Sequence, residues 1–514
     1  MASTSKAIAT NDSPFCEARL AMDKIIERLL AMADEGATAD DVTRLLAGDG
    51  TALLRDLLQG YLDRCAEKER RVQVVGADGV ERKEARVSSR RVETPVGEVE
   101  VKRLLYQAAG VEGIAPLDAA LGLPNEKYSH ELRRIVAEEA AKSSFDEVVE
   151  LISKRTGGSV PKRQVEELTA RAAQDFDAFY AERLCEPESS ADLLVLSFDS
   201  KGIAMRHEHL REATRKAAAT EPRHLQTRLT KGEKPNRKRM AQVATVYSVA
   251  RWTRTIADVL HGLRDEECAH RRPRPTHKRL WASADRDAQD VIDDAFREAL
   301  RRDPERKRRW VVLVDGHHDQ LARVHRAAAK FDARITIVLD VVHALEKLWL
   351  AAYSFHKEGT PEAEAWVQHQ FVKLLTGSTG GAIAKSLRSM IKRRGLDPSA
   401  ARPVEKAAKY FVRATRMLHY DRALADGLPI ATGVIEGACR YLVQDRLGRT
   451  GARWSLQGSE AVLRLRALKA SGDFDDYWQF HLARERERTH ATRYANGVVP
   501  NPLTSSRPKL RLVK

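Results

Sequence analysis

The chain has 514 residues, a length that implies several domains and excludes a single small module. Hydrophobic residues make up 43% and charged residues 31%, which is typical of globular proteins and not of disordered or fibrous ones. Lys and Arg outnumber Asp and Glu by 88 to 73, a formal charge of +15, so we expect a partner with phosphates or an anionic membrane surface. Because no apolar run is long enough to span a membrane and no secretory signal is visible, we expect a cytoplasmic protein that does not enter a membrane. The five cysteines are far apart, so neither a disulfide framework nor a cysteine zinc site is expected.

The N-terminal third of the chain is predicted to consist of helices around a small β unit. Leu and Ile residues three to four positions apart predict amphipathic helices in residues 1–66. Residues 67–115 form short alternating segments, in which Asp78-Gly79 is a hairpin turn signal, and they predict a small β unit. Helical spacing returns in residues 116–188.

This last region contains the outline of a helix-turn-helix. A first helix is followed by a turn at residues 156–158 and by a second helix begun by Ser159 and Pro161. Helical hairpins with glycine turns also occur only to pack a core, so both interpretations stay open. If the motif binds DNA, we expect Lys162 and Arg163 at the start of the second helix to contact it.

From residue 189 the pattern changes to short apolar runs that end in an aspartate. The runs DLLVLSFD, WVVLVD and RITIVLD end at Asp199, Asp315 and Asp340. Their length and their Leu, Val and Ile content without strict alternation predict central strands covered on both faces. A further strand is predicted at residues 240–250 and a helix at residues 283–302. The region is therefore predicted to be a mixed α/β domain.

The strand pattern stops after the third aspartate. We expect residues 189–342 to form the first part of the α/β domain and residues 343–430 to form a helical insertion. Residues 431–481 are expected to complete the domain. Residues 482–514 are basic and interrupted by proline, which predicts a flexible arm.

Aspartates at the ends of neighbouring strands are candidates for a metal site. Functional groups collect at the carboxyl ends of such strands, which lie about 4.8 Å apart, so their carboxylates can share one cation. One aspartate at a strand end is commonly a turn or helix-capping residue, but three in one domain weaken that interpretation. Oxygen ligands without a cysteine set favour Mg²⁺ or Mn²⁺, which usually serve sites that act on phosphates.

Four segments, in this order and at these distances, resemble a known family. They are DLLVLSFDSKGIAMR, VVLVDGHHDQL, ITIVLDVVHALEKLW and GVIEGACRYLVQDRLGRTGARWS. The chain is similar to bacterial insertion-sequence transposases of the DDE type, most closely the ISKra family and more distantly the Mutator-like transposases, over about residues 90–470. The resemblance implies an RNase H-like mixed sheet with a helical insertion. It also implies that Asp199, Asp315 and Glu436 are the catalytic, metal-binding triad.

The choice of the second acid rests on strand order. In the RNase H-like order the first strand is central, the fourth lies beside it and the fifth lies one place further out, so Asp315 is nearer than Asp340 to the aspartate of the first strand. Asp340 and His343 form a D-x-x-H pattern similar to a secondary motif of related transposases, which implies a supporting role. Asp340 as a direct metal ligand stays an alternative, and Glu460 is the next candidate for the third acid.

Basic residues near these acids suit DNA phosphates. A basic loop is predicted at residues 201–239. The residues predicted to contact DNA here and after the third acid are Arg237, Lys238, Arg239, Arg440, Arg446, Arg449 and Arg453.

The resemblance implies an enzyme that cuts and joins the ends of an insertion sequence. Its expected partners are double-stranded DNA, namely terminal inverted repeats and target DNA, and further copies of the chain on that DNA. Two alternatives stay open. One is an RNase H-like nuclease or recombinase, and the other is an inactive transposase-derived DNA-binding regulator.

Overall fold

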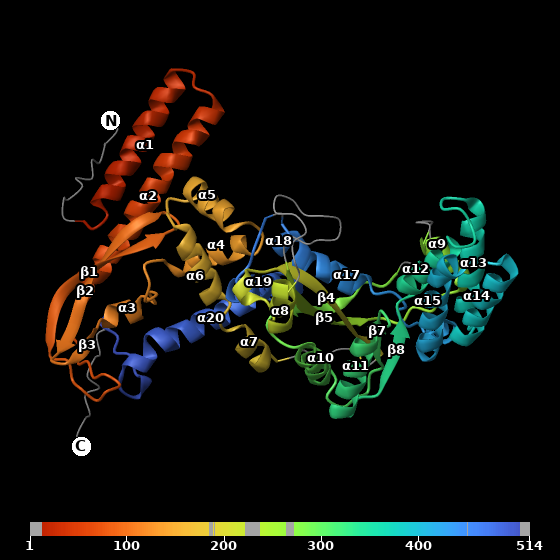
Figure 1. Cartoon of the computed structure of the whole chain (residues 1–514). Coiled ribbons are helices and arrows are strands. Elements are labelled where there is room, and N and C mark those ends of the chain that lie inside the picture. The colour runs from red at the N-terminus through yellow and green to blue at the C-terminus, as the bar shows by residue number, and fades with distance from the viewer. Residues whose placement is uncertain are drawn as a thin grey trace. The chain divides into compact units, whose positions relative to one another are not determined.

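The fold comes from a computed structural model of the chain (Figure 1). The structure describes residues 13–184, 189, 191–220, 237–263, 272–449 and 451–503. The chain forms two compact units, one made of Met1–Ala181 with Phe474–Lys514 and the other of Glu182–Asp473. Among the described residues, no helix is both long enough and apolar enough to span a bilayer.

The first unit begins with a helical hairpin that packs on a three-stranded antiparallel sheet. The elements are α1 (Cys16–Asp34), α2 (Ala39–Lys68), β1 (Glu84–Thr94), β2 (Gly97–Ala108) and β3 (Val111–Ile114). Thr38 and Asp41 form a capping box that starts α2. Leu62 of α2 joins a core with Val99 and Val101 of β2, which attaches the hairpin to the sheet.

Helices complete the first unit. They are α3 (Pro116–Ala120), α4 (His130–Ala140), α5 (Phe145–Arg155), α6 (Lys162–Ala172), α7 (Phe176–Glu182) and α20 (Phe474–Thr489), with the short helices η4 (Ala491–Arg493) and η5 (Ala495–Gly497). Helices α4, α5 and α6 pack around one apolar core that includes Leu132, Ile152 and Leu168. Gly157, between α5 and α6, donates its N–H to the Pro95 carbonyl at 2.8 Å, so this turn is held against the β1–β2 turn. The two helices of the predicted helix-turn-helix are therefore present, and their contact with DNA stays a prediction.

The C-terminal segment is ordered further than the sequence indicated. The sequence predicted a flexible arm from residue 482, but α20 continues to Thr489. Beyond it Tyr494 is buried in a core with Val74 and Tyr106. The segment is held in place because its side chains, both apolar and charged, are buried against the rest of the first unit. Residues 504–514 lie outside the described residues.

A buried ionic network attaches α20 to the rest of this unit. The Asp175 carboxylate accepts two hydrogen bonds from Arg488, at 2.7 and 2.8 Å, and one from Nδ1 of His481 at 2.7 Å. Glu485 lies 3.0 Å from Arg488 and 3.2 Å from Arg133. Burial alone would raise the pKa of Asp175, but the hydrogen bonds from His481 and Arg488 lower it to about 2.

We expect Asp175→Asn to destabilise the protein by about 2 kcal/mol at neutral pH, because the amide keeps the shape but loses the charge that pairs with Arg488. The folded pKa lies below the ordinary value near 3.8, so this contribution is present above about pH 4 and is lost as the pH falls towards 2. Urea denaturation of the full chain at several pH values measures it. Asp177→Asn, an exposed carboxyl nearby, is the control, and an equal loss in both variants contradicts the assignment.

The second unit is built on a five-stranded mixed sheet. Its strands are β4 (Leu193–Ala204), β5 (Lys238–Val249), β6 (Thr276–Ser283), β7 (Trp310–Val314) and β8 (Ile335–Leu339). Their order is β6-β5-β4-β7-β8. Strand β5 is antiparallel to β4 and β6, whereas β7 is parallel to β4 and β8. The predicted mixed α/β fold is confirmed, and so is the position of the first strand beside the fourth.

Two features of this sheet differ from the sequence-based expectation. Strand β6 was not predicted, because its first four residues, from Thr276 to Arg279, are polar or charged and do not form an apolar run. Strand β4 does not end at Asp199, because β5 pairs with it as far as Ala204 after its pairing with β7 has ended. Asp199 therefore lies inside β4, at the point where the strand no longer has β7 beside it.

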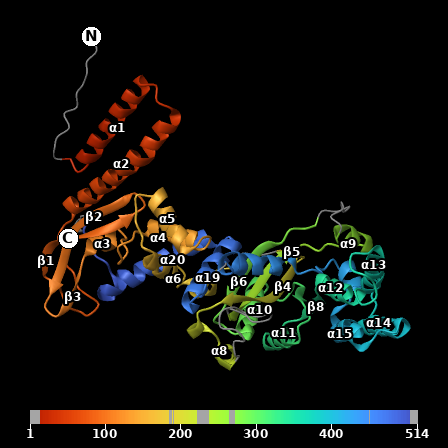
Figure 2. The ribbon, with the colours of Figure 1, turned by 45° about the horizontal axis from the view of Figure 1, so that its top comes forward.

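Helices cover both faces of the sheet (Figures 1 and 2). Those near the sheet are α10 (Ala288–Arg302), α11 (His318–Lys330), α17 (Gly433–Ala438), the π-helix η3 (Cys439–Gln444), α18 (Asp445–Leu447) and α19 (Leu456–Ser471). The unit also contains η1 (His207–His209) and α8 (Glu212–Thr220), and α9 (Ile256–Leu263) lies beside the helices of the region after β8 in both views. Phe198 faces α10, whereas its neighbour Asp199 contacts η3. Because successive strand residues point to opposite faces, α10 and η3 cover opposite sides of the sheet.

The region predicted as a helical insertion is helical. It contains α12 (Val341–Ala352), α13 (Pro361–Leu375), α14 (Gly380–Arg394), α15 (Pro398–Ala414), η2 (Thr415–Met417) and α16 (Tyr420–Ala425). Buried Tyr420 of α16 donates its hydroxyl to the Leu339 carbonyl at 3.1 Å. These helices therefore support the end of β8.

Candidate functional site

Three aspartates lie in register at one edge of the sheet. The β4–β7 pairing ends two residues before Asp199 and Asp315, and the β7–β8 pairing ends one residue before Asp315 and Asp340. Within a parallel pair, residues in register lie side by side about 4.8 Å apart. Asp199 and Asp315 continue this register past the end of the β4–β7 pairing, as Asp315 and Asp340 do past the end of the β7–β8 pairing. The sheet therefore places the three strand-end aspartates at one edge, and of these three only Asp340 belongs to a group of described side chains close enough to share a metal.

Asp340 is fully buried and is the N-cap of α12. Its carboxylate accepts backbone N–H groups from Val342 at 3.3 Å, His343 at 3.4 Å and Thr432 at 3.1 Å, and its Oδ2 lies 2.6 Å from the His343 ring. Burial works to raise the pKa of Asp340, but the hydrogen bonds from His343 and Thr432 outweigh burial and lower it. The carboxylate is thus held as an anion that positions its neighbours.

His343 is oriented by this carboxylate. The hydrogen bond that Nδ1 of His343 donates to Asp340 raises the pKa of His343 against the opposing effect of burial. Because Nδ1 faces Asp340, Nε2 is the ring nitrogen left for another partner. Histidines that bind metals commonly donate their second ring N–H to a carboxylate in this way.

Glu436 joins these residues in a group with the spacing of a metal site. One ligand atom each from Asp340, His343 and Glu436 lies within 4.8 Å of the others. Thr432, whose N–H bonds Asp340, donates its hydroxyl to Glu436 at 3.2 Å. Two carboxylates and an imidazole fit Mn²⁺ better than Mg²⁺, which takes mainly oxygen ligands. Since the oxygens of Asp340 already accept hydrogen bonds, His343 and Glu436 are the more open ligands.

Asp199 is held by a cysteine that the sequence did not single out. The Ser200 N–H bonds Oδ1 of Asp199 at 2.6 Å, and Sγ of Cys439 lies 3.2 Å from Oδ2. Burial, and then the charge of Asp199, raise the pKa of Cys439, so its thiol stays protonated and donates to the carboxylate. Cys439 begins the π-helix, a distortion often found at functional sites. The spacing of Cys439 from other residues in the sequence did not indicate this role.

Asp315 is fixed by the turn after β7 and by the helical region. Its Oδ1 accepts the His317 N–H at 2.8 Å, and its carbonyl accepts the Tyr410 hydroxyl at 2.9 Å. Gly316 has a φ of +85°, and a Cβ there would lie 2.9 Å from Leu339 and 3.1 Å from Tyr410. Only glycine fits this position without displacing its neighbours. Tyr410 is a second residue that the sequence analysis missed.

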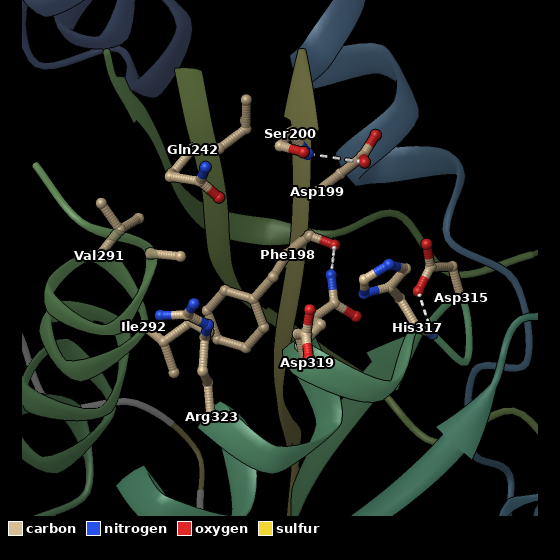
Figure 3. Close-up of a pocket in the computed structure, with 13 residues that line it drawn as sticks. Phe198, Asp199, Ser200, Gln242, Val291, Ile292, Asp315, His317, Asp319 and Arg323 are labelled. Carbon is tan, nitrogen blue, oxygen red and sulfur yellow. Dashed lines mark hydrogen bonds between the residues drawn. The ribbon is translucent and has the colours of Figure 1, made fainter. Parts of the chain in front are cut away.

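A cavity of about 250 Å³ opens beside the acids, between the sheet and helices α10 and α11. Figure 3 shows Phe198 in this cavity with Ile292 and Arg323 around it, while Asp199 points away towards the C-terminal helices. Asp315 lies at its edge. The cavity thus lies at the same edge of the sheet as the acids, and Asp199 and Asp315 are among the residues that line it.

The predicted DNA-contacting residues of this unit divide into two groups. Arg440, Arg449 and Arg453 are exposed, as is Lys238, and Arg237 is partly buried. Their exposure would let a phosphate backbone reach them, although that contact stays a prediction.

Two of the predicted arginines have structural roles instead. Arg446 is 3% exposed and its guanidinium lies 4.8 Å from the Trp454 ring centroid, so it does not belong to a basic surface. Helical periodicity places Arg446 on the buried side of its helix. Arg239 is mostly buried and donates to the carbonyls of Ala284 and His209, so it ties neighbouring loops together.

The predicted basic loop is only partly a loop. Its first residues belong to β4, η1 and α8, and its end belongs to β5. Residues 221–236 lie outside the described residues. Glu460 also has a structural role, since it accepts N–H groups from Ala284 and Asp285 beside β6. Glu460 does not belong to the group of acids around Asp340.

Lys162 and Arg163 lie exposed at the start of α6 in the first unit. They pair with Asp146 at 2.7 Å and Glu167 at 3.1 Å. Exposed pairs of this kind contribute little to stability, so either cation can exchange its carboxylate for a phosphate.

Comparisons with known proteins assign no family. No protein-family model matches the chain, and no curated protein matches it. Among solved structures, the Drosophila P element transposase strand transfer complex is similar at 11% sequence identity and a TM-score of 0.22, over 77% of this chain and 84% of that chain. This likeness is too weak to define the fold.

We expect Gly316→Ala to destabilise the protein by about 1–3 kcal/mol, because alanine is strained at this positive φ and its Cβ meets Leu339 and Tyr410. Gly437→Ala on α17 is the matched control, since no atom lies within 4 Å of its added Cβ and alanine favours the helix. Thermal unfolding of both full-length variants measures the difference. Equal melting temperatures for the two variants would show that the turn does not depend on glycine.

Proposed function

We propose that the chain is a DDE-type transposase of the ISKra kind, which cleaves DNA strands at the ends of an insertion sequence and joins them to target DNA. The observation that carries this proposal is the alignment of Asp199, Asp315 and Asp340 across adjacent strands, with Glu436 close to the last of them. Carboxylates gathered at one edge of a protein with a formal charge of +15 suit a cation that acts on phosphates. The strand order, with an antiparallel second strand, fits an RNase H-like sheet.

The residues around the acids determine how a metal would be held. We propose Asp199, Asp315 and Glu436 as the ligands, for Mg²⁺ or Mn²⁺. When bound, the metal would activate water or a DNA 3′-hydroxyl and stabilise the leaving oxygen of a phosphodiester. Cys439 fixes one carboxylate oxygen of Asp199. Thr432 fixes one oxygen of Glu436.

Asp340 is proposed to position these groups rather than to bind the metal. It connects the N–H of Thr432 with the ring of His343, and both of these residues lie beside Glu436. The alternative is that Asp340, His343 and Glu436 form the metal site themselves, because their ligand atoms are already close enough. The two arrangements differ in how strongly activity depends on Asp340.

Double-stranded DNA is the proposed partner, as terminal repeats and as target. Arg440, Arg449 and Arg453 are exposed in the segment that follows Glu436. In the first unit, Lys162 and Arg163 stand at the start of a helix within a three-helix core, the position from which a helix-turn-helix reaches the major groove. We propose that the first unit recognises the ends and that the second acts on them, with several copies on one DNA.

The test is strand cleavage and joining on duplexes that carry the ends of the element encoding the chain, with Mg²⁺ or Mn²⁺. Asp199→Asn, Asp315→Asn and Glu436→Gln should each lower both rates more than about 100-fold while end binding is kept, because the amides keep size but lose the ligand charge. Asp340→Asn should cost about 10- to 100-fold, as expected for a residue that orients ligands. Glu346→Gln, an exposed acid on α12, is the control and should stay near wild type.

Three outcomes would contradict parts of this proposal. Cleavage without joining would indicate a nuclease or recombinase, and specific binding without any cleavage would indicate a regulator. A complete loss in Asp340→Asn, together with a loss of stabilisation by Mn²⁺, would make Asp340 a direct ligand. Near-normal cleavage by Glu436→Gln would remove that residue from the set.

The role of the first unit has its own test. The double variant Lys162→Ala, Arg163→Ala should weaken end binding and reduce the slope of log K against log salt by about 0.9 for each phosphate that the variant no longer neutralises. Titrations of the full chain with end DNA at several salt concentrations measure it. Lys24→Ala, which removes an exposed charge from α1, is the control. An unchanged slope in the double variant would exclude these two residues from the interface.

A further inference from the structure

The helical hairpin of α1 and α2 carries an unusual concentration of exposed apolar side chains. Of the seventeen large hydrophobic residues exposed among the described residues, eight lie on these two helices. Single exposed apolar residues are normal on a protein surface, but a contiguous group indicates an interaction site. This feature is independent of the acids and of the proposed function.

Seven of these side chains share one broad face, here called the hairpin face. They are 42% to 63% exposed and comprise Met22, Ile26, Leu30, Leu46, Leu54, Leu57 and Tyr61. Buried Ala18 and Ile25 mark the side of α1 that faces α2, and Gly60, which meets Phe15, marks the side of α2 that faces α1.

Helical periodicity places the two sets together. Successive residues of a helix are rotated by about 100° around its axis. On each helix, the exposed apolar residues lie roughly a quarter turn around that axis from the side that faces the other helix, and the direction of this rotation is the same on both helices. A twofold axis perpendicular to the plane of two antiparallel helices exchanges them, and this rotation leaves each face of the plane on its own side. Both sets therefore lie on the same face of the hairpin, and this face is apolar over both helices.

The charges of the hairpin do not suit DNA. Residues 16–68 contain eleven acidic and seven basic side chains, in a chain whose formal charge is +15. The outer edge of α1 presents acids, exposed Asp23 and Glu27 among them, whereas the outer edge of α2 presents Arg44 and Arg55, which pair with Asp41 and Asp56 of their own helix. Exposed pairs of this kind are weak, so both arginines can pair with the acids of a second copy instead. An apolar face with one acidic and one basic edge is self-complementary.

We propose that the hairpin face pairs with the same face of a second copy of the chain and forms a four-helix bundle. A twofold axis parallel to the helices places α1 of each copy on α2 of the other, so that the acidic edge of one copy meets the basic edge of its partner. The other twofold arrangement places α1 on α1 and sets the acids against each other. The charges therefore select the first arrangement.

The mass of the full chain in solution, free of DNA, tests the pairing by light scattering coupled to gel filtration. The wild type should have twice the mass of one chain, and Ile26→Glu and Leu57→Glu should each shift it to the mass of one chain. Leu20→Glu is the matched control: Leu20 is also 47% exposed on α1 but lies a third of a turn from Ile26, so the dimer should persist. Circular dichroism should show unchanged helix content in all three variants.

The arrangement of the helices has a separate test. Asp23→Lys with Glu27→Lys should weaken the dimer at least about tenfold at low salt and less at high salt, since the charges at the edge are exposed. A wild type with the mass of one chain would overturn the proposal, and so would a dimer that survives both Ile26→Glu and Leu57→Glu. An unchanged dissociation constant after the charge reversal would overturn the placement of α1 on α2.

Discussion

The common register of β4, β7 and β8 is the constraint on which the second unit depends. Side chains of a strand alternate between the two faces of a sheet, so a slip of one residue would turn Asp199 away from Asp315 and Asp340. The register is held by apolar residues that are buried on both faces, such as Val312. The chemistry of the edge is thus determined by packing in the centre.

Carboxylates gathered at one edge of a sheet repel each other, and the structure offsets the repulsion with hydrogen-bond donors. Asp199 accepts bonds from Ser200 and Cys439, while Asp340 accepts backbone N–H groups at the start of α12. Ser200 belongs to β4 itself, whereas the other donors come from helices that follow β8 in sequence or return to the sheet from the C-terminal part. The helical region contributes Tyr410 and Tyr420, which hold the ends of β7 and β8. Its physical role in this unit is therefore to support the edge where the acids lie.

The first unit joins segments that are far apart in the sequence. Helix α20 is attached to helices more than 300 residues earlier by the ionic network around Asp175, where every charge has an opposite partner. Burying these charges is tolerated because they pair within hydrogen-bond distance. The helical hairpin, in contrast, leaves one apolar face exposed. The hairpin is acidic, whereas the residues predicted to contact DNA at the start of α6 are basic. The first unit therefore has two different kinds of surface.

The sequence by itself determined the features that depend on local pattern. Apolar runs predicted β4, β7 and β8, and strand ends identified Asp315 and Asp340 as neighbours, because alternation and helical spacing involve residues close in the chain. Only the tertiary structure decided the rest. The thiol at Asp199 comes from 240 residues away, β4 is extended by its pairing with β5, and Arg446 is turned into the core. These features depend on contacts between segments that are far apart in the sequence. Such contacts produce no periodic pattern of residues, so the sequence alone did not predict them.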